Sequence, residues 1–249
     1  MNFPSLQDKV ALVTGAGGTM GRAAAEALIA LGCRVALVDL KREALRPIEA
    51  RFGDKVFAVG CDIGDPDAVA AAHAEVRAGF GPVELLVNNA GVLSNNKIES
   101  TSAEEWRRVM AANLDGAMYW SQQVVPGMKQ RRWGRIINTS SLAAKTGGLT
   151  AGTAYSVSKG AMSALTFSLA RELAGFGVTA NAIAPAYVRT PMVTEQLNEG
   201  QRQDLLKQIP VGRFCEPEEF AHVVCFLASP LSGFITGEII DLNGGLLMD

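Results

Sequence analysis

The segment AYSVSKG, residues 154–160, places a phenol and an ammonium group four residues apart. Residues four apart share one face of a helix, so Lys159 can sit beside Tyr155. A free tyrosine has a pKa of about 10, and lowering it by about three units takes roughly 4 kcal/mol. A positive charge about 4 Å away supplies that much at an effective dielectric of about 20. The pair therefore predicts a general acid–base group in which Lys159 lowers the pKa of Tyr155.

A glycine-rich segment, VTGAGGTMG, ends the first apolar run of the chain. Glycines at a strand-to-helix junction let the backbone approach a pyrophosphate, and the helix N-terminus offers free N–H groups. Asp39 closes the next apolar run, at about the twenty-residue interval of dinucleotide-binding folds. Its carboxylate can accept hydrogen bonds from a ribose and would repel a 2′-phosphate, which favours NAD over NADP. Lys41 and Arg42 are nearby cations that could accommodate a phosphate.

Short apolar runs, which predict strands, alternate along the chain with longer runs that predict helices. We expect strands within 9–15, 34–40, 55–63, 83–91, 135–141, 178–186 and 238–245, and helices within 21–32, 42–53, 65–81, 101–114, 118–128, 153–177 and 217–229. Pro47 is expected to interrupt the helix within 42–53 or to delay its start. The segment 187–207 is expected to be irregular. Apolar strands separated by helices imply a parallel sheet covered on both faces, and right-handed crossovers make it doubly wound. We therefore predict an α/β fold with a single Rossmann-like domain, residues 1–249, and about seven strands.

The composition is that of an ordinary globular protein, with 48% hydrophobic residues, 19% charged residues and a net charge of -2. The dense basic cluster at 129–135 is interpreted as a helix C-terminus, so no nucleic-acid partner is expected. Four cysteines and two histidines show no metal-ligand spacing, so we expect reduced thiols and no metal site. We see neither a signal peptide nor the run of about 18 apolar residues that a membrane span needs. A cytoplasmic protein without membrane contact is expected.

The chain resembles the short-chain dehydrogenase/reductase family over nearly its whole length, from KVALVTG to IDLNGG. Thr14, Gly15 and Gly21 match the family motif T-G-x-x-x-G-x-G, whereas Thr19 replaces its middle glycine. The segments CDI (61–63), NNAG (88–91) and APAYVRTPM (184–192) match family segments around the cofactor, with Ala186 in place of the usual glycine. The resemblance implies NAD contacts at these positions: Gly15, Gly18, Thr19, Met20, Asp39, Asp62, Ile63, Asn89, Ala90, Gly91, Tyr155, Lys159, Val188 and Thr190.

The resemblance also implies four catalytic residues: Asn113, Ser141, Tyr155 and Lys159. Asn113 matches the asparagine that holds a proton-relay water. Ser141 matches the serine that hydrogen-bonds the substrate oxygen, although the interval to Tyr155 is one residue longer than usual and Ser140 is the alternative. Tyr155 exchanges a proton with the substrate, and Lys159 also hydrogen-bonds the nicotinamide ribose.

We predict an NAD-dependent oxidoreductase that acts on a small secondary alcohol or ketone, with a pocket walled by 93–96, 142–153 and a substrate loop at 187–207. The first alternative is an NADPH-dependent 3-oxoacyl-ACP reductase, which needs a basic patch for its acidic carrier protein. Arg132 matches one position of that patch, and Phe176 stands at the other. The second alternative is a non-catalytic dinucleotide-sensing or scaffold protein. The resemblance further implies a homotetramer, built through the long helices near Met118 and Met162 and through the last helix and strand.

Overall fold

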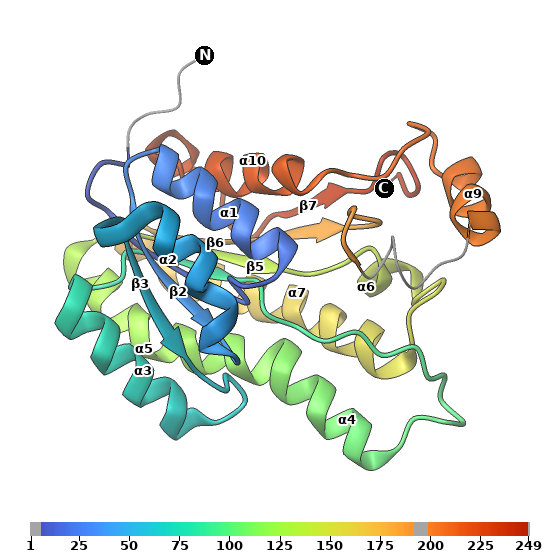
Figure 1. The fold of residues 1–249 in the computed structure, drawn as a ribbon, viewed down its shortest axis with the longest axis horizontal. Coiled ribbons are helices and arrows are strands. Elements are labelled where there is room, and N and C mark those ends of the chain that lie inside the picture. The colour runs from blue at the N-terminus through green and yellow to red at the C-terminus, as the bar shows by residue number, and fades with distance from the viewer. Residues whose placement is uncertain (1–5, 192–198, 249) are drawn as a thin grey trace.

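A single parallel sheet of seven strands, in the order β3-β2-β1-β4-β5-β6-β7, forms the centre of the computed structural model (Figure 1). The structure describes residues 6–191 and 199–248. The strands are β1 Val10–Thr14, β2 Arg34–Asp39, β3 Val56–Gly60, β4 Leu85–Asn88, β5 Gly134–Thr139, β6 Val178–Pro185 and β7 Ile239–Leu242. Four of them, β1, β4, β5 and β6, are buried along their whole length, which is why their sequences do not alternate. The predicted α/β fold is confirmed.

Helices cover both faces of the sheet (Figure 1). On one face α1, Thr19–Ala30, packs against α10, Pro217–Ala228. On the other face α3, Pro66–Phe80, packs against α5, Gly116–Arg131, and α7, Thr153–Leu173, packs against β6. Successive residues of a strand point to opposite faces, so Ala11 and Val13 join the core under α1 while Val10 and Leu12 join the core under α3.

The expected interruption at Pro47 is confirmed: the 3-10 turn η1, Arg42–Leu45, precedes α2, Arg46–Phe52, because Pro47 fits only the first turn of a helix. Two other segments differ from the sequence-based expectation. The helices expected at 101–114 and 118–128 are joined: α4, Ala103–Met110, runs through a π-helical turn, Ala111–Asp115, into α5. The segment expected to be irregular contains α9, Glu199–Gln208, and its residues 192–198 lie outside the described part of the chain.

All four cysteines are free thiols, as expected. Burial raises the pKa of Cys33 to about 12 and that of Cys61, Cys215 and Cys225 to about 11. These thiols therefore stay protonated at neutral pH. Over the described residues, no group of three or more potential ligands could hold a metal ion, and no helix is long and apolar enough to cross a membrane.

Candidate active site

A cavity of about 190 Å³ lies between residues that follow the strand ends of β1, β4, β5 and β6 and the first turns of α7. The strand order reverses between β1 and β4, and open α/β sheets bind ligands at such a point. The structure brings together at this cavity the predicted residues Met20, Asn89, Gly91, Tyr155, Lys159, Val188 and Thr190. Residues expected to hold a dinucleotide and the expected acid–base pair thus share one cavity.

The glycine turn between β1 and α1 is too tight for side chains at two positions. Gly15 has a φ of +65°, and a Cβ there would lie 2.8 Å from the Cα atom of Ala90. A Cβ on Gly21 would collide with the carbonyl oxygen of Gly15. The backbone of this turn can therefore approach a ligand without side chains in between.

The N-terminus of α1 leaves backbone N–H groups available to a ligand. Its first intrahelical hydrogen bond runs from the N–H of Arg22 to the carbonyl of Gly18, at 2.9 Å, and no side chain caps the helix. The N–H groups of Thr19 and Met20 come before that bond, where amides commonly bind phosphate. Thr19 replaces a family glycine without strain, because it begins α1 and does not have a positive φ.

The carboxylate of Asp39 lies at the end of β2, beside the glycine turn. It accepts hydrogen bonds from the N–H of Gly17, at 3.0 Å, and from the N–H of Lys41, at 3.4 Å. The guanidinium of Arg42 is held by two hydrogen bonds to the Glu49 carboxylate, at 2.9 and 3.3 Å. Asp39 is therefore fixed next to the expected phosphate site, while the neighbouring Arg42 charge is paired.

Asp62 and Ile63 follow β3 and do not line the cavity. The carboxylate of Asp62 accepts a hydrogen bond from the N–H of Gly64, at 3.0 Å, and is exposed. Ile63 packs on Gly116, where a Cβ would lie 2.6 Å from Cδ1 of Ile63. Both residues lie beyond Asp39 in the order of the sheet, on the side expected for the adenine.

Thr14 ties the NNAG segment to the glycine turn. Its hydroxyl oxygen accepts hydrogen bonds from the N–H groups of Asn89, at 3.0 Å, and Ala90, at 3.1 Å. The side-chain amide of Asn89 donates in return to the carbonyl of Thr14, at 3.0 Å. The sequence indicated Thr14 only as part of a motif, because the partners of its hydroxyl lie 73 or more residues away.

Asn113 is fully buried in the π-helical turn between α4 and α5. Its amide donates to the carbonyl of Val92 and to the hydroxyl of Ser158, both at 3.0 Å, and accepts from the N–H of Val92 at 2.7 Å. Ser158 in turn donates to the carbonyl of Tyr155 at 2.7 Å. Sequence reasoning missed Ser158, which links Asn113 to the helical turn that carries the phenol.

The two candidate serines point in different directions. The hydroxyl of Ser140 hydrogen-bonds the carbonyl of Lys159 and the hydroxyl of Ser163, both at 3.0 Å, within the packing between β5 and α7. Ser141 accepts a hydrogen bond from the N–H of Ala143, at 3.1 Å, and its side chain hydrogen-bonds Tyr155, which acts to lower the pKa of the phenol. Ser141 is therefore the serine that faces the phenol.

The pKa values of Tyr155 and Lys159 on α7 differ from the prediction. Lys159 is 3% exposed, its Nζ donates to the carbonyl of Thr139 at 2.8 Å, and it lies 5.8 Å from the centre of the Tyr155 ring. Burial lowers the pKa of Lys159 to about 8 and raises the pKa of Tyr155 above its ordinary value. The predicted lowering of the Tyr155 pKa is therefore wrong for the protein alone, because desolvation of the phenolate outweighs the favourable interactions.

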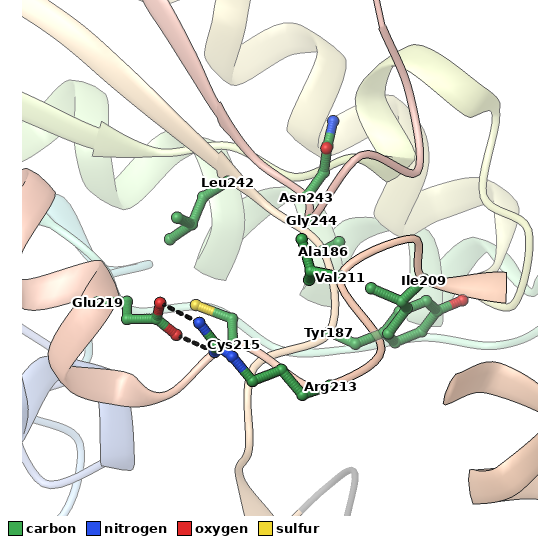
Figure 2. A pocket seen from close by; sticks show the side chains of 10 residues that line it. All are labelled: Ala186, Tyr187, Ile209, Val211, Arg213, Cys215, Glu219, Leu242, Asn243 and Gly244. Atoms are coloured by element: carbon green, nitrogen blue, oxygen red, sulfur yellow. Dashed lines mark hydrogen bonds and ion pairs between the residues drawn. The ribbon is translucent and has the colours of Figure 1, made fainter. Parts of the chain in front are cut away.

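A second cavity, of about 150 Å³, is lined by Ala186, Tyr187 and Cys215 among others (Figure 2). Ala186 lines both cavities, and Val188 and Thr190 of the same segment line the first. The backbone of Cys215 forms two hydrogen bonds with this segment. Its N–H donates to the carbonyl of Tyr187 at 3.0 Å, and its carbonyl accepts from the backbone N–H of Arg189 at 2.8 Å. Arg213 and Glu219 form two hydrogen bonds, at 2.6 and 2.8 Å, beside it. No sequence signal marked this support, since the pairing joins segments about 27 residues apart.

Comparisons with known proteins find relatives that match over nearly the whole chain. A family model described as "Enoyl-(Acyl carrier protein) reductase" matches residues 15–247. The 3-oxoacyl-[acyl-carrier-protein] reductase FabG of Vibrio cholerae is 39% identical over 245 residues, which cover 98% of this chain and 99% of that protein. The short-chain reductase protein NovJ of Streptomyces niveus is 41% identical, covering 96% and 94%. A crystal structure titled short-chain dehydrogenase/reductase SDR:glucose/ribitol dehydrogenase, from Brucella melitensis, superposes with a TM-score of 0.92 at 33% identity, covering both chains fully.

Proposed function

The chain belongs to the short-chain dehydrogenase/reductase family of oxidoreductases, and from this premise we propose that it exchanges a hydride between NAD(H) and a secondary alcohol or ketone. The observation that carries the proposal is that Tyr155 and Lys159 line the same cavity as the expected dinucleotide contacts, with Ser141 facing the phenol. The nicotinamide coenzyme, when bound, supplies the hydride acceptor or donor.

The residues at the strand ends fit a dinucleotide. A side chain at Gly15 or Gly21 would fill the turn, and the uncapped amides of α1 suit a pyrophosphate. Asp39 would hold the adenosine ribose, and the Val188 backbone and Thr190 the carboxamide. The carboxylate of Asp39 disfavours a 2′-phosphate beside it, which supports NAD(H) over NADP(H).

The proton chemistry belongs to the protein. Burial keeps Tyr155 protonated at rest, so the phenol holds the proton that a ketone oxygen must receive. Ser141 would donate a hydrogen bond to the same oxygen and stabilise the charge that develops on it. Lys159 would stabilise the phenolate left behind. The side-chain amide of Asn113 donates hydrogen bonds to Val92 and Ser158. Asn113 would therefore position the loop at Val92 and, through Ser158, the turn of α7 that carries Tyr155.

A second candidate, reduction of 3-oxoacyl groups on an acyl carrier protein, is favoured by the relatives named FabG, which are 36–39% identical over nearly the whole chain. Surface charge also supports it. The Nζ of Lys129 lies 4.1 Å from the centre of the Phe176 ring, so a cation occupies the place where the expected second basic residue is missing. Arg132, the first basic position, donates to the carbonyl of Gly175 at 3.0 Å and lies on the same surface.

One experiment separates the candidates. Initial rates would be measured with NADH and with NADPH, using a 3-oxoacyl thioester on acyl carrier protein, the same thioester on coenzyme A, and a panel of secondary alcohols and ketones. We expect turnover with NADH as the better coenzyme. Preference for the carrier-bound thioester, lost in Lys129→Glu, would establish the second candidate. Binding of NADH without turnover of any substrate would overturn the enzymatic proposal and favour the sensing or scaffold alternative.

A further inference from the structure

An arginine lies at the wall of the expected adenosine site. The turn η1, Arg42–Leu45, packs on the glycine turn, since a Cβ on Gly17 would lie 2.7 Å from Cβ of Ala44 and 3.0 Å from Oδ2 of Asp39. Arg42 itself packs on Gly60, because a Cβ added to Gly60 would lie 3.2 Å from the Cβ of Arg42. Gly60 is the β3 residue paired with Asp39 in the sheet. The Arg42 side chain therefore starts directly beside the place expected for the ribose 2′ position.

The guanidinium of Arg42 is held by Glu49 of α2. Nη2 donates to Oε1 at 2.9 Å and Nη1 to Oε2 at 3.3 Å, a parallel two-bond arrangement that fixes the plane of the guanidinium. The two side chains are 51% and 28% exposed, so solvent screens the pair and its contribution is modest. A phosphate offers arginine the same two-bond geometry as a carboxylate. Glu49 thus competes with any phosphate for Arg42.

We propose that Glu49 is a positioning residue for coenzyme selection, which holds Arg42 away from a 2′-phosphate. The inference rests on the proposed function, in which Asp39 contacts the ribose. Two residues would then contribute to the preference for NAD over NADP. Asp39 repels the 2′-phosphate, and Glu49 keeps Arg42 from neutralising it. Glu49 acts only through Arg42, so removing Arg42 removes the effect of Glu49.

The test measures dissociation constants of NADH and NADPH by fluorescence titration, and of AMP and 2′,5′-ADP by calorimetry, none of which needs turnover. Glu49→Gln should tighten NADPH and 2′,5′-ADP by about two- to five-fold, the range of one exposed ion pair. NADH and AMP should stay within about two-fold, and the gain should shrink as salt screens the guanidinium. Glu49→Gln combined with Arg42→Ala should abolish the gain.

Glu26→Gln is the matched control, because it breaks another exposed ion pair, from Glu26 of α1 to Arg51 at 2.8 Å. It should change none of the four constants. If the wild type prefers NADH but Glu49→Gln leaves NADPH affinity unchanged, or if the gain survives Arg42→Ala, the role of Glu49 is overturned while the proposed function stands. If the wild type binds NADPH as tightly as NADH, the proposed coenzyme preference fails, and this inference fails with it.

Discussion

At the scale of single residues, the Tyr155 hydroxyl is the group whose removal tests the proton chemistry most directly. Tyr155→Phe keeps the ring and its packing but removes the proton that the substrate oxygen must receive. We expect turnover to be abolished, while the dissociation constant of NADH, measured by fluorescence titration, stays within about two-fold. Activity above about a tenth of the wild-type value would contradict the assigned role.

The serine pair gives a prediction with a built-in control. Ser141→Ala should raise the activation free energy by roughly 2.7–4 kcal/mol and lower kcat accordingly, which is the usual effect of losing one hydrogen-bond donor to a developing oxyanion. Ser140→Ala should mainly lower the melting temperature, because its hydroxyl is bonded to Lys159 and Ser163 in the packing of α7. Steady-state kinetics and thermal unfolding of both variants decide the matter. The reverse pattern would make Ser140 the catalytic serine.

Lys159 should make stability depend on pH in a predictable direction. Burial lowers its pKa from an ordinary 10.5 to about 8, so between these values the unfolded chain binds more protons than the folded one. The buried charge therefore opposes folding most below pH 8, by up to about 3 kcal/mol, and this penalty fades as the pH rises. Lys159→Met should raise the melting temperature relative to the wild type most at pH 7, and the difference should shrink toward pH 10.

The loss of the hydrogen bond to the Thr139 carbonyl lowers the stability of Lys159→Met by an amount that hardly changes with pH. Only the slope of the difference reports the buried charge. Calorimetric melting of both proteins from pH 7 to pH 10 measures it. A difference that is constant over this range would show that Lys159 is not held with a lowered pKa.

What the sequence predicts about single residues depends on how far apart their partners lie. Tyr155 and Lys159 form a recognisable pair because both sit on one helix at a fixed interval. No local pattern identifies Ser158 or Glu49. Ser158 accepts a hydrogen bond from Asn113, which lies 45 residues away, and Glu49 matters only because the Arg42 side chain points toward it. The pKa of Tyr155 also escaped prediction, since desolvation depends on the packing of the whole site.

At the scale of elements, the strands were predictable and several connections were not. Parallel strands buried on both faces must be apolar throughout, so β1 and β6 stand out in the sequence. The helix α9 carries few apolar residues, among them Leu205 and Leu206, so its periodicity is too weak to mark a helix. The π-helical turn joining α4 to α5 contains Asn113, whose hydrogen-bond partners Val92 and Ser158 lie 21 and 45 residues away, so no local pattern predicts these contacts.

The ion pair of Arg213 and Glu219 should strengthen coenzyme binding, because it lies beside Cys215, which pairs with the segment that carries Val188. Arg213→Met should loosen the pairing of Cys215 with Tyr187 and Arg189, raising the KM of NADH several-fold with less effect on kcat. Hydrogen bonding from Arg213 lowers the pKa of Glu219 to about 2. The support is therefore complete above the ordinary carboxyl pKa and is lost only as the pH falls toward 2.

Glu219→Ala serves as the comparison for Arg213→Met. Glu219 also accepts a hydrogen bond from the N–H of Glu216 at the start of α10, at 2.9 Å. Its loss should lower stability by about 0.5–2 kcal/mol as a weakened helix cap, in addition to the effect on KM. KM, kcat and melting temperature of the two variants separate the two roles. An unchanged KM in Arg213→Met would show that the Val188 segment is positioned without this ion pair.

At the scale of the whole molecule, the exposed apolar side chains indicate where copies of the chain would meet. Val157 and Phe167 are exposed on α7, on one face of the sheet, and Leu231 and Phe234 are exposed between α10 and β7. Met162, near which an interface was expected, is instead 1% exposed within its own chain. Two separate apolar surfaces are what a closed tetramer with two kinds of two-fold contact requires.

The homotetramer that the family resemblance implies can be tested by charging each surface in turn. The wild type should have four times the 26.3 kDa of one chain by light scattering after size-exclusion chromatography. Phe167→Glu and Phe234→Glu should each leave one two-fold contact intact and give dimers, because each places unpaired charges in one interface only. The double variant should give monomers. Both side chains are exposed in the single chain, so neither change disturbs its core, and circular dichroism should be unchanged. A wild type of 26.3 kDa, or variants that stay tetrameric, would show that these two surfaces do not assemble the protein.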